Sequence, residues 1–344
     1  MYAPKKVKVL VVDDSFLFRE AVARGISKDK GIEVVGTASN PFEARDLIID
    51  LEPDVLTLDI EMPRMNGIEF LKKLMPQYPM PVVVVSALSN NVFEALDAGA
   101  VDFVTKPNSG TINGLDGFIN ELIIKIKIAS VAKVNQNKNE YRHNQLNVNT
   151  KMNVNDTIIA IGASTGGTEA IFDIISAFSR EMPGIVIVQH MPPVFTKMYA
   201  QRLNASCRME VKEAEHGDDI IPGRVLIAPG DKHLKVNKKG NSYIVEYFNG
   251  DKVNGHKPSV DILFNSVAEK AGSSAIGVIL TGMGYDGAKG LLNMKQKGAI
   301  TIGQDEKSCV VYGMPKVAYD IGAVLKQVSL NYIPQIIYSI INKA

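Results

Sequence analysis

Short runs of aliphatic and β-branched residues alternate with helical patterns along most of the chain, and this alternation constrains the fold more than any other feature. Before residue 130 the runs are KVKVLVV, IEVVGTA, VLTL, PVVVV and VDFVT, separated by helical stretches such as FLFREAVARGI and NVFEALDAG. Near-continuous apolar strands that alternate with helices form parallel sheets covered on both faces. We therefore predict a doubly wound α/β domain in this part of the chain.

The same alternation resumes in the second half, with IIAIGA, GIVIVQH, RVLIAPG, AIGVILTG and GAITIGQ. Between the third and fourth of these runs, HLKVNKKGNSYIVEYF predicts a β-hairpin with a Lys-Gly-Asn turn. The segment 135–155 holds eight Asn in 21 residues and no sustained apolar period, which is typical of an extended linker. We predict one α/β domain over 1–130, a flexible Asn-rich linker over 131–154 and a second α/β domain over 155–344.

Composition excludes several classes of protein. The chain is 46% hydrophobic and 22% charged, which is ordinary for a soluble globular protein. Its two cysteines, Cys207 and Cys309, cannot build a disulfide framework or a four-cysteine zinc site. No run approaches the roughly 18 consecutive apolar residues of a membrane span. The first apolar run ends in two acids after only six residues, so it predicts a strand rather than the apolar core of a signal segment. We expect a cytoplasmic protein without membrane insertion.

The net charge of +1 is unevenly distributed. Residues 1–130 carry 14 Lys and Arg against 18 Asp and Glu, and the remainder carries 24 against 19. No basic stripe is visible, so we do not expect a nucleic-acid partner. The opposite signs of the two parts allow them to attract each other.

Polar residues in the first domain cluster where its predicted strands end. Asp13 and Asp14 end the first strand and Asp59 ends the third, while Ser86 and Lys106 end the fourth and fifth. A single strand-end acid is most often a helix cap, but in a doubly wound sheet all five positions meet at the carboxyl edge. Three clustered carboxylates need a cation, and oxygen ligands suit Mg²⁺. One carboxylate could then attack a phosphoryl group while Lys106 balances charge.

The segments VVDDS, LTLDIEMPRMNG, VVVVSAL and VDFVTKP resemble the response-regulator receiver domain along its whole length. The resemblance implies a flavodoxin-like fold in which Asp59 is the phospho-acceptor and Phe103 holds the place of the switch aromatic. The residues implied to place Mg²⁺ are Asp13, Asp14, Asp59 and, through its backbone carbonyl, Glu61. Those implied to contact the phosphoryl group are Ser86 and Lys106.

In the second domain, TIIAIGASTGGTEAIFDII reads as a strand, a sharp Gly-rich turn and a helix, with Ser164 in the turn. The segment GASTG satisfies the G-x-S-x-G pattern that exposes a nucleophilic serine above a helix N-terminus. Backbone N–H groups there can stabilise an oxyanion. Taken alone, the pattern is a weak indication of catalysis, because a phosphate-binding loop or a tight strand–helix turn also gives it.

A serine nucleophile needs a base, and the chain has only five histidines. His190 and His233 both follow apolar strands and could reach the carboxyl edge. His190 lies nearer to its strand end, so we prefer it. His143 lies in the predicted linker and His216 in a polar turn, while His256 lies at the start of a helix, where it could help to bind something.

Asp286 follows another apolar strand, in LTGMGYDGAKG, and could be the acid that orients the imidazole. A competing interpretation exists, because residues 282–287 match G-x-G-x-x-G and Asp305 follows at the spacing of a dinucleotide-binding site. Such a fingerprint normally opens its domain, whereas this one lies near the end. It would also leave Ser164 and His190 without a role. The order Ser…His…Asp differs from the Ser…Asp…His order of α/β-hydrolases.

Over essentially the whole chain, the sequence is similar to the chemotaxis protein-glutamate methylesterase family (CheB type). The resemblance lies in the order of a receiver, a linker and then the segments GASTGG, VQHM, HKPSVDILF and LTGMGYDGAKG. The resemblance implies a Rossmann-like three-layer catalytic domain with Ser164 as nucleophile, His190 as general base and Asp286 as the orienting acid. The implied oxyanion donors are the backbone N–H groups of Thr165 and Met283. No metal or other cofactor is implied in this domain.

The same resemblance implies an activity and partners. The activity is hydrolysis of glutamyl methyl esters and, in many members, deamidation of glutamines on the cytoplasmic helices of chemoreceptors. Methylated chemoreceptors would be the substrate and the chemotaxis histidine kinase the phosphodonor, and we expect a monomer. The receiver would cover the Ser164 edge until Asp59 is phosphorylated.

Two functions of other classes remain open at the level of sequence. One is a binding module that senses a nucleotide through the two Gly-rich turns. The other is a phosphorylation-controlled adaptor that performs no chemistry.

Overall fold

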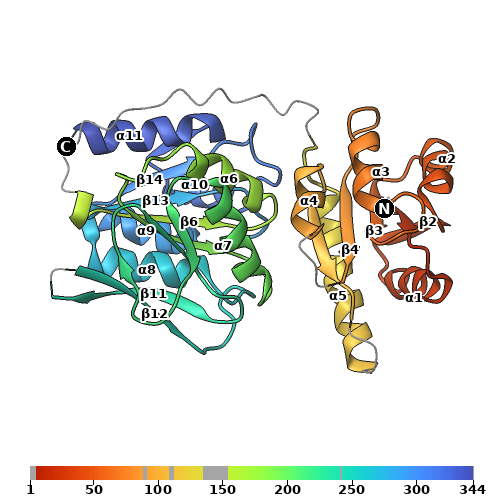
Figure 1. Cartoon of the computed structure of the whole chain (residues 1–344), viewed down its shortest axis with the longest axis horizontal. Coiled ribbons are helices and arrows are strands. Elements are labelled where there is room, and N and C mark those ends of the chain that lie inside the picture. The colour runs from red at the N-terminus through yellow and green to blue at the C-terminus, as the bar shows by residue number, and fades with distance from the viewer. Residues whose placement is uncertain (1–4, 88–90, 108–111, 135–153, 241, 344) are drawn as a thin grey trace. The chain divides into compact units, whose positions relative to one another are not determined.

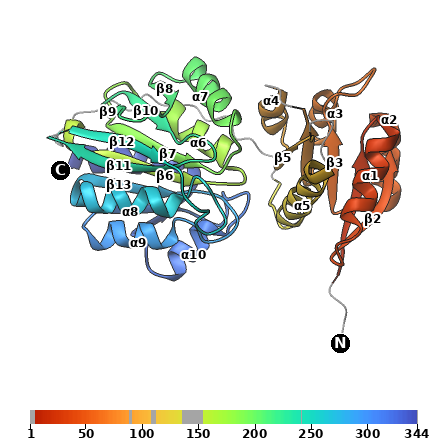
Figure 2. The ribbon, with the colours of Figure 1, turned by 90° about the horizontal axis from the view of Figure 1, so that it is seen from below.

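The computed structural model describes residues 5–87, 91–107, 112–134, 154–240 and 242–343. The chain separates into two compact units, Met1–Asn139 and Glu140–Ala344, and each is described by itself (Figures 1 and 2). Most of the predicted linker, residues 135–153, lies outside the described residues, and so does His143. Among the described helices, none combines the length and the apolar character of a membrane span.

The first unit is a parallel five-stranded sheet with strand order β2-β1-β3-β4-β5. Its strands are β1 (Val7–Val12), β2 (Ile32–Ala38), β3 (Val55–Asp59), β4 (Val82–Ser86) and β5 (Asp102–Thr105). Its helices are α1 (Phe16–Ile26), α2 (Pro41–Leu51), α3 (Gly67–Leu74), α4 (Asn91–Asp97) and α5 (Ile112–Ala129). Strands β3 and β4 are buried along their whole length, as their apolar sequences predict. The predicted doubly wound fold is confirmed for this unit.

The strand order of the first unit reverses at β1. From β1 the chain passes to β2 on one side and later to β3 on the other, so that β1 and β3 are neighbours. In open α/β sheets, ligands bind outside the carboxyl ends of the strands at such a switch point. Asp13 directly follows β1 and Asp59 ends β3, so both acids lie at that point.

The second unit is a larger sheet of seven strands in the order β15-β14-β13-β6-β7-β10-β8, and all its strand pairs are parallel. The strands are β6 (Ile158–Ala163), β7 (Gly184–Gln189), β8 (Glu210–Glu213), β10 (Arg224–Ile227), β13 (Ala275–Ile279), β14 (Ile300–Gln304) and β15 (Lys326–Val328). The central strands β6, β7 and β13 are buried at every residue.

Helices cover both faces of this sheet, which confirms the predicted three-layer α/β fold. Figure 2 shows α6 and α7 on one side and α8, α9 and α10 on the other. The helices are α6 (Gly167–Ser176), α7 (Phe195–Ser206), α8 (Val260–Lys270), α9 (Ala288–Gln296), α10 (Met314–Asp320) and α11 (Ile333–Lys343). Short 3₁₀ turns occur at Val154–Asp156, Gly272–Ser274 and Leu330–Tyr332.

The predicted hairpin is also present. Strands β11 (His233–Lys239) and β12 (Ser242–Phe248) pair antiparallel, and the short strand β9 (Asp219–Ile220) extends them to a three-stranded sheet. Strands β8, β9 and β15 were not predicted. Their sequences EVKE, DI and KQV contain no apolar run, because they lie at sheet edges where each strand keeps at least one exposed residue and at most one buried residue.

Candidate functional site

Ser164 lies at the switch point of the larger sheet. Strand β6 has β7 on one side and β13 on the other, and Ser164 is the first residue after β6. The segment after β13 meets this turn directly, because the backbone N–H of Ser164 donates to the carbonyl of Thr281 at 3.0 Å. A Cβ on Gly282 would lie 2.6 Å from the Cβ of Ser164, so only glycine permits this approach.

The turn that carries Ser164 is a tight strand–helix connection. Gly166 has φ 76° and precedes the first residue of α6, and the N–H of Gly167 donates to the carbonyl of Ser164 at 2.7 Å. A Cβ on Gly167 would lie 2.2 Å from Oε1 of Gln189. Ser164 therefore lies, partly exposed, at the positive end of a helix, where backbone N–H groups favour a developing negative charge.

Both predicted oxyanion donors belong to the two segments that meet here. Thr165 follows Ser164 in the turn, and Met283 follows Gly282 in the segment after β13. The hydrogen bond between Ser164 and Thr281 fixes these two segments to each other.

His190 directly follows β7, and its ring has two different edges. Its Nε2 lies 2.9 Å from Oδ2 of Asp286, and both side chains are buried (7% and 1% exposed). Its Nδ1 is buried and has no hydrogen-bond partner within the described part of the chain. The backbone N–H of His190 donates to the carbonyl of Ala163 at 3.1 Å, next to the Ser164 turn. One ring nitrogen is therefore engaged by an acid, and the other can take a proton.

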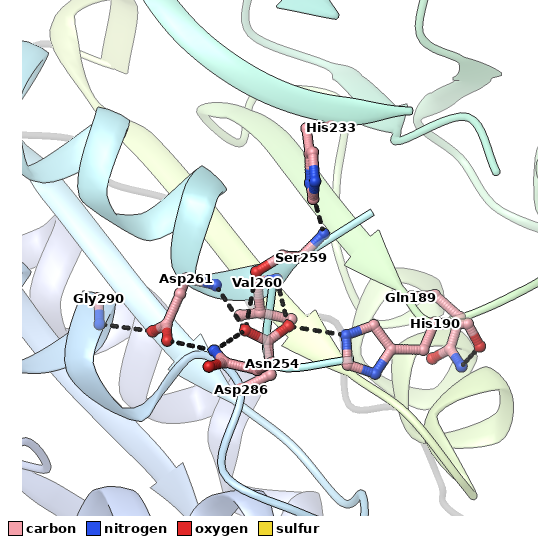
Figure 3. A network of polar contacts seen from close by, with 9 residues as sticks. All are labelled: Gln189, His190, His233, Asn254, Ser259, Val260, Asp261, Asp286 and Gly290. Carbon is pink, nitrogen blue, oxygen red and sulfur yellow. Dashed lines mark hydrogen bonds and ion pairs between the residues drawn. The ribbon is translucent and has the colours of Figure 1, made fainter. Parts of the chain in front are cut away.

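Asp286 is held by an unusually complete set of donors (Figure 3). Apart from His190 these all come from residues 254–261. They are Asn254 Nδ2 at 2.8 Å, Ser259 Oγ at 2.8 Å and the backbone N–H groups of Val260 at 2.7 Å and Asp261 at 3.2 Å. Burial alone would raise the pKa of Asp286, but the bonds to His190, Asn254 and Ser259 hold that pKa well below its ordinary value. Asp286 is therefore an ionised carboxylate in a fixed orientation.

His233, the alternative base, is placed differently. It is 1% exposed, with Nε2 2.8 Å from the carbonyl oxygen of Asp251 and Nδ1 3.3 Å from the backbone N–H of Ser259. Both nitrogens are thus engaged with backbone groups, so the proton is on Nε2. The structure brings His190, and not His233, next to Asp286.

The groups required by the dinucleotide interpretation have local partners. The carboxylate of Asp305 accepts from the N–H of Ser308 at 3.0 Å and from its hydroxyl at 2.7 Å. Asp286, inside the G-x-G-x-x-G segment, is the partner of His190. This arrangement does not favour Asp305 as a ribose ligand. His216 is exposed, with its ring edge against Tyr247.

In the first unit, the predicted cluster of polar residues is assembled at the switch point. Nζ of Lys106 lies 2.8 Å from Oδ2 of Asp13 and 2.7 Å from Oδ2 of Asp59. Burial raises the pKa of Asp59 to about 6, against the opposing effect of Lys106. Burial alone would lower the pKa of Lys106, but its hydrogen bonds to the two carboxylates raise it.

The donor set of this cluster fits a hard divalent cation. Oxygen atoms of Asp13, Asp14 and Asp59 lie within 4.8 Å of one another, and the N–H of Glu61 donates to Asp59 Oδ1 at 3.2 Å, so the Glu61 backbone lies beside them. Carboxylate and carbonyl oxygens are the ligands that Mg²⁺ takes. The hydroxyl of Ser86 is buried and without a hydrogen-bond partner among the described residues, as expected of a group that contacts an incoming ligand.

Sequence reasoning missed the residues that surround Asp286. Asn254, Ser259 and Asp261 contact it from a segment about 25 to 32 positions earlier in the chain. The Asn-Gly dipeptide at 254–255 was the available signal, because it marks a tight two-residue turn.

Comparison with known proteins gives two matching family models. The model described as CheB methylesterase matches residues 159–337, and that of the response regulator receiver domain matches residues 9–112. A Syntrophomonas wolfei protein named protein-glutamate methylesterase/protein-glutamine glutaminase 2 is 58% identical over 339 residues, covering 98% of this chain and 99% of its own. A Salmonella typhimurium protein named protein-glutamate methylesterase/protein-glutamine glutaminase is 47% identical and covers 96% of this chain and 95% of its own.

A solved structure resembles the second unit. The CheB methylesterase catalytic domain of Thermotoga maritima is 40% identical, with a TM-score of 0.53. The match covers 54% of this chain and 98% of that domain.

Proposed function

Because the chain belongs to the CheB methylesterase family, with a response-regulator receiver domain ahead of the methylesterase domain, we propose that it hydrolyses glutamyl methyl esters on the cytoplasmic helices of chemoreceptors. The observation that carries this proposal is the His190–Asp286 pair beside Ser164 at the switch point of the sheet. We also propose that the same site deamidates specific glutamines, as the names of the relatives suggest.

The proposed mechanism uses the two edges of His190. Ser164 Oγ attacks the γ-carbonyl of the ester while Nδ1 of His190 accepts the hydroxyl proton, and Asp286 on Nε2 stabilises the imidazolium that forms. The backbone N–H groups of Thr165 and Met283 bind the oxyanion. His190 gives this proton to the methoxide oxygen, which leaves as methanol, and a glutamyl-serine ester remains. Water then hydrolyses that ester, with His190 again as the base. With glutamine the leaving group is ammonia. The mechanism requires no metal in this unit.

In the receiver we propose that Asp59 accepts a phosphoryl group from the chemotaxis histidine kinase. Asp13, Asp14, Asp59 and the Glu61 carbonyl would hold Mg²⁺, which when bound neutralises charge on the phosphoryl oxygens. Ser86 and Lys106 would contact those oxygens. The hydroxyl of Ser86, which is buried and has no partner in the part of the chain that the structure describes, and the ammonium group between the two acids support this assignment.

The domain organisation gives the proposed control. The receiver would occupy residues 1–130, the linker 131–154 and the methylesterase domain 155–344. Unphosphorylated receiver would cover the Ser164 edge, and phosphorylation would shift the population toward an uncovered state. We propose that the protein works as a cytoplasmic monomer whose partners are methylated chemoreceptors and the kinase.

The experiment that tests this function measures methanol release from methylated receptor, with and without acetyl phosphate and Mg²⁺. We expect release by the wild-type protein and a faster rate with the phosphodonor. Absence of methanol release together with stoichiometric nucleotide binding by the second unit would favour the binding module instead. Full chemotactic function of a Ser164→Ala protein in cells would favour the adaptor.

A further inference from the structure

His256, which has no part in the proposed mechanism, lies face to face with the base. The ring centroids of His190 and His256 are 3.8 Å apart and the ring planes differ by 7°. The contact leaves both nitrogen edges of His190 free for Asp286 and Ser164, because it covers a face of the ring. Two contacts therefore define the orientation of His190: the carboxylate of Asp286 at one edge and the imidazole of His256 on one face.

His256 is the last residue of a tight turn. Val253 and His256 exchange two backbone hydrogen bonds, of 3.0 and 2.9 Å, which closes a two-residue hairpin. The central residues Asn254 and Gly255 both have positive φ, 52° and 84°. This combination defines a type I′ turn, for which Asn-Gly is the most favoured sequence. The hydrogen bonds of the turn thus fix the backbone of His256 independently of its contact with His190.

The same turn holds the acid of the pair. Nδ2 of Asn254 donates to Oδ1 of Asp286 at 2.8 Å and to Oδ2 of Asp261 at 2.7 Å (Figure 3). Asp261 is itself fixed, because its Oδ1 accepts from the N–H of Gly290 at 2.7 Å. Asn254 therefore bonds to Oδ1 of Asp286, whereas His190 and the N–H of Val260 bond to Oδ2. Two residues of one turn contact the acid and the base separately.

The segment that carries the turn is anchored on both sides. His233 bonds to the carbonyl of Asp251 before the turn and to the N–H of Ser259 after it. Lys257 forms an ion pair of 3.1 Å with Asp231. The buried His233 therefore has a structural role, in which its two ring nitrogens join the backbone on either side of the turn.

We propose that the turn Val253–His256 is a positioning element for the catalytic pair, in which Asn254 fixes the carboxylate of Asp286 and His256 fixes the ring plane of His190. This inference rests on the proposed Ser164–His190–Asp286 mechanism. In that mechanism His190 receives a proton on Nδ1 and returns it without losing Asp286. A face contact resists tilting of the ring while leaving the proton path open. Misplacement of a reacting group by about 1 Å can cost on the order of 10²-fold in rate.

Three substitutions in the full-length protein test the proposal by methanol release. His256→Ala removes the stacked ring, and we expect kcat to fall by roughly 10- to 100-fold with KM nearly unchanged, because orientation rather than binding is lost. His256→Phe keeps a flat face against His190 and should recover most of kcat. Asn254→Gly keeps the left-handed backbone but removes the amide, and should also lower kcat.

A control and a second readout separate positioning from a purely structural effect. His216→Ala removes an exposed histidine that contacts an aromatic ring away from the site, and should retain wild-type kcat. The downfield NMR resonance of the His190 Nε2 proton should be sharp in the wild type and in His256→Phe, and broadened by exchange in His256→Ala. A loss of stability alone would lower the melting temperature without this change.

Wild-type kcat in both His256→Ala and Asn254→Gly would overturn the proposal. So would equal loss of activity in His256→Ala and His256→Phe with the His190 resonance unchanged in both. If instead Ser164→Ala retained the wild-type rate, the proposed function would fail. The His190 resonance would still report whether the turn orients the imidazole, so the two failures are distinguishable.

Discussion

At the scale of single residues, the partners of two buried histidines distinguish their roles. His190 and His233 both lie near the carboxyl ends of strands, and their positions in the sequence allow either to act as a base. His190 faces a carboxylate, and its Nδ1 has no hydrogen-bond partner among the described residues, whereas His233 is bonded at both nitrogens to the backbone. Only the first arrangement suits proton transfer, because a base needs one nitrogen available and a charged group to stabilise its protonated form.

We therefore expect His190→Gln to lose activity by on the order of 10⁴-fold, as in other serine triads. His233→Gln should show a lower melting temperature and a much smaller fall in rate, because it loses one of the two backbone contacts of the ring. Methanol-release rates and thermal unfolding of the two proteins make the comparison. An active His190→Gln protein beside an inactive, folded His233→Gln protein would contradict this assignment of the base.

Asp59 gives a pH-dependent prediction for the receiver. Its pKa is raised from 3.8 to about 6 by burial, so the folded state binds this proton more tightly than the unfolded state. The free energy of unfolding should therefore fall as the pH rises from about 4 to about 6, and this loss persists at neutral pH. Asp59→Asn removes the titrating group, and should raise the stability of the receiver at pH 7 by on the order of 1–3 kcal/mol.

Denaturant unfolding of wild type and Asp59→Asn at pH 4 and pH 7 measures this difference. The two proteins should be alike at pH 4 and different at pH 7. Added Mg²⁺ should stabilise the wild type more than the variant, because the variant lacks one of the three carboxylates. Equal stability at both pH values would mean that burial does not raise the pKa of Asp59 in solution.

At the scale of elements, the strands that could be predicted from the sequence are those that are buried. Long apolar strands such as β4 and β6 are recognisable because they are buried along their whole length. The edge strands β8 and β15 carry polar residues and give no such signal. The residues at the strand ends could be predicted because parallel strands deliver their carboxyl ends to one edge.

The surroundings of Asp286 could not be predicted in the same way. Asn254 and His256 reach the site from a turn far from both His190 and Asp286 in sequence, so their contacts depend on tertiary packing. The Asn-Gly sequence predicts the turn. It does not say which two side chains the turn brings to the catalytic pair.

Gly282 lies where the segment after β13 packs closely against the turn that carries Ser164. An added Cβ would lie 2.5 Å from Met314 Sδ and 2.6 Å from Ser164 Cβ, so Gly282→Ala should displace the turn that carries the nucleophile. We expect a loss of rate on the order of 10²-fold together with a lower melting temperature. Wild-type methanol release by Gly282→Ala would show that the two segments are not as closely packed as described.

Gly117→Ala serves as the matched control. Gly117 is exposed in helix α5, and an added Cβ there would meet nothing within 4 Å. This substitution should leave the rate unchanged and stabilise the receiver by about 0.5–1 kcal/mol, since alanine loses less backbone entropy than glycine in a helix.

At the scale of the whole molecule, the chain combines a response-regulator receiver domain with a methylesterase domain, and residues 1–130 carry a net charge opposite in sign to that of the remainder. If the unphosphorylated receiver covers the Ser164 edge, a fragment starting near Asn153 should be more active than the unphosphorylated full-length protein. Acetyl phosphate should bring the full-length protein toward the fragment. A change in the ratio of uncovered to covered molecules from 1:99 to 99:1 needs roughly 5.5 kcal/mol of differential stabilisation. The fold-activation by acetyl phosphate therefore measures how strongly the unphosphorylated protein favours the covered state.

Methanol-release rates of the fragment and of the full-length protein, with and without acetyl phosphate, test this coupling. A phosphorylated full-length protein faster than the fragment would mean that the receiver also activates directly. Equal rates for the fragment and the unphosphorylated full-length protein would eliminate occlusion as the means of control.

The central claim is that Ser164 is the nucleophile of an ester hydrolase, and Ser164→Ala tests it most directly. The substitution removes one oxygen from a partly exposed turn residue, so the fold should be retained, which circular dichroism and the melting temperature can verify. Methanol release from methylated receptor should then fall by about 10⁴- to 10⁶-fold, by analogy with other serine triads. A folded Ser164→Ala protein that keeps a rate close to that of the wild type would contradict the account.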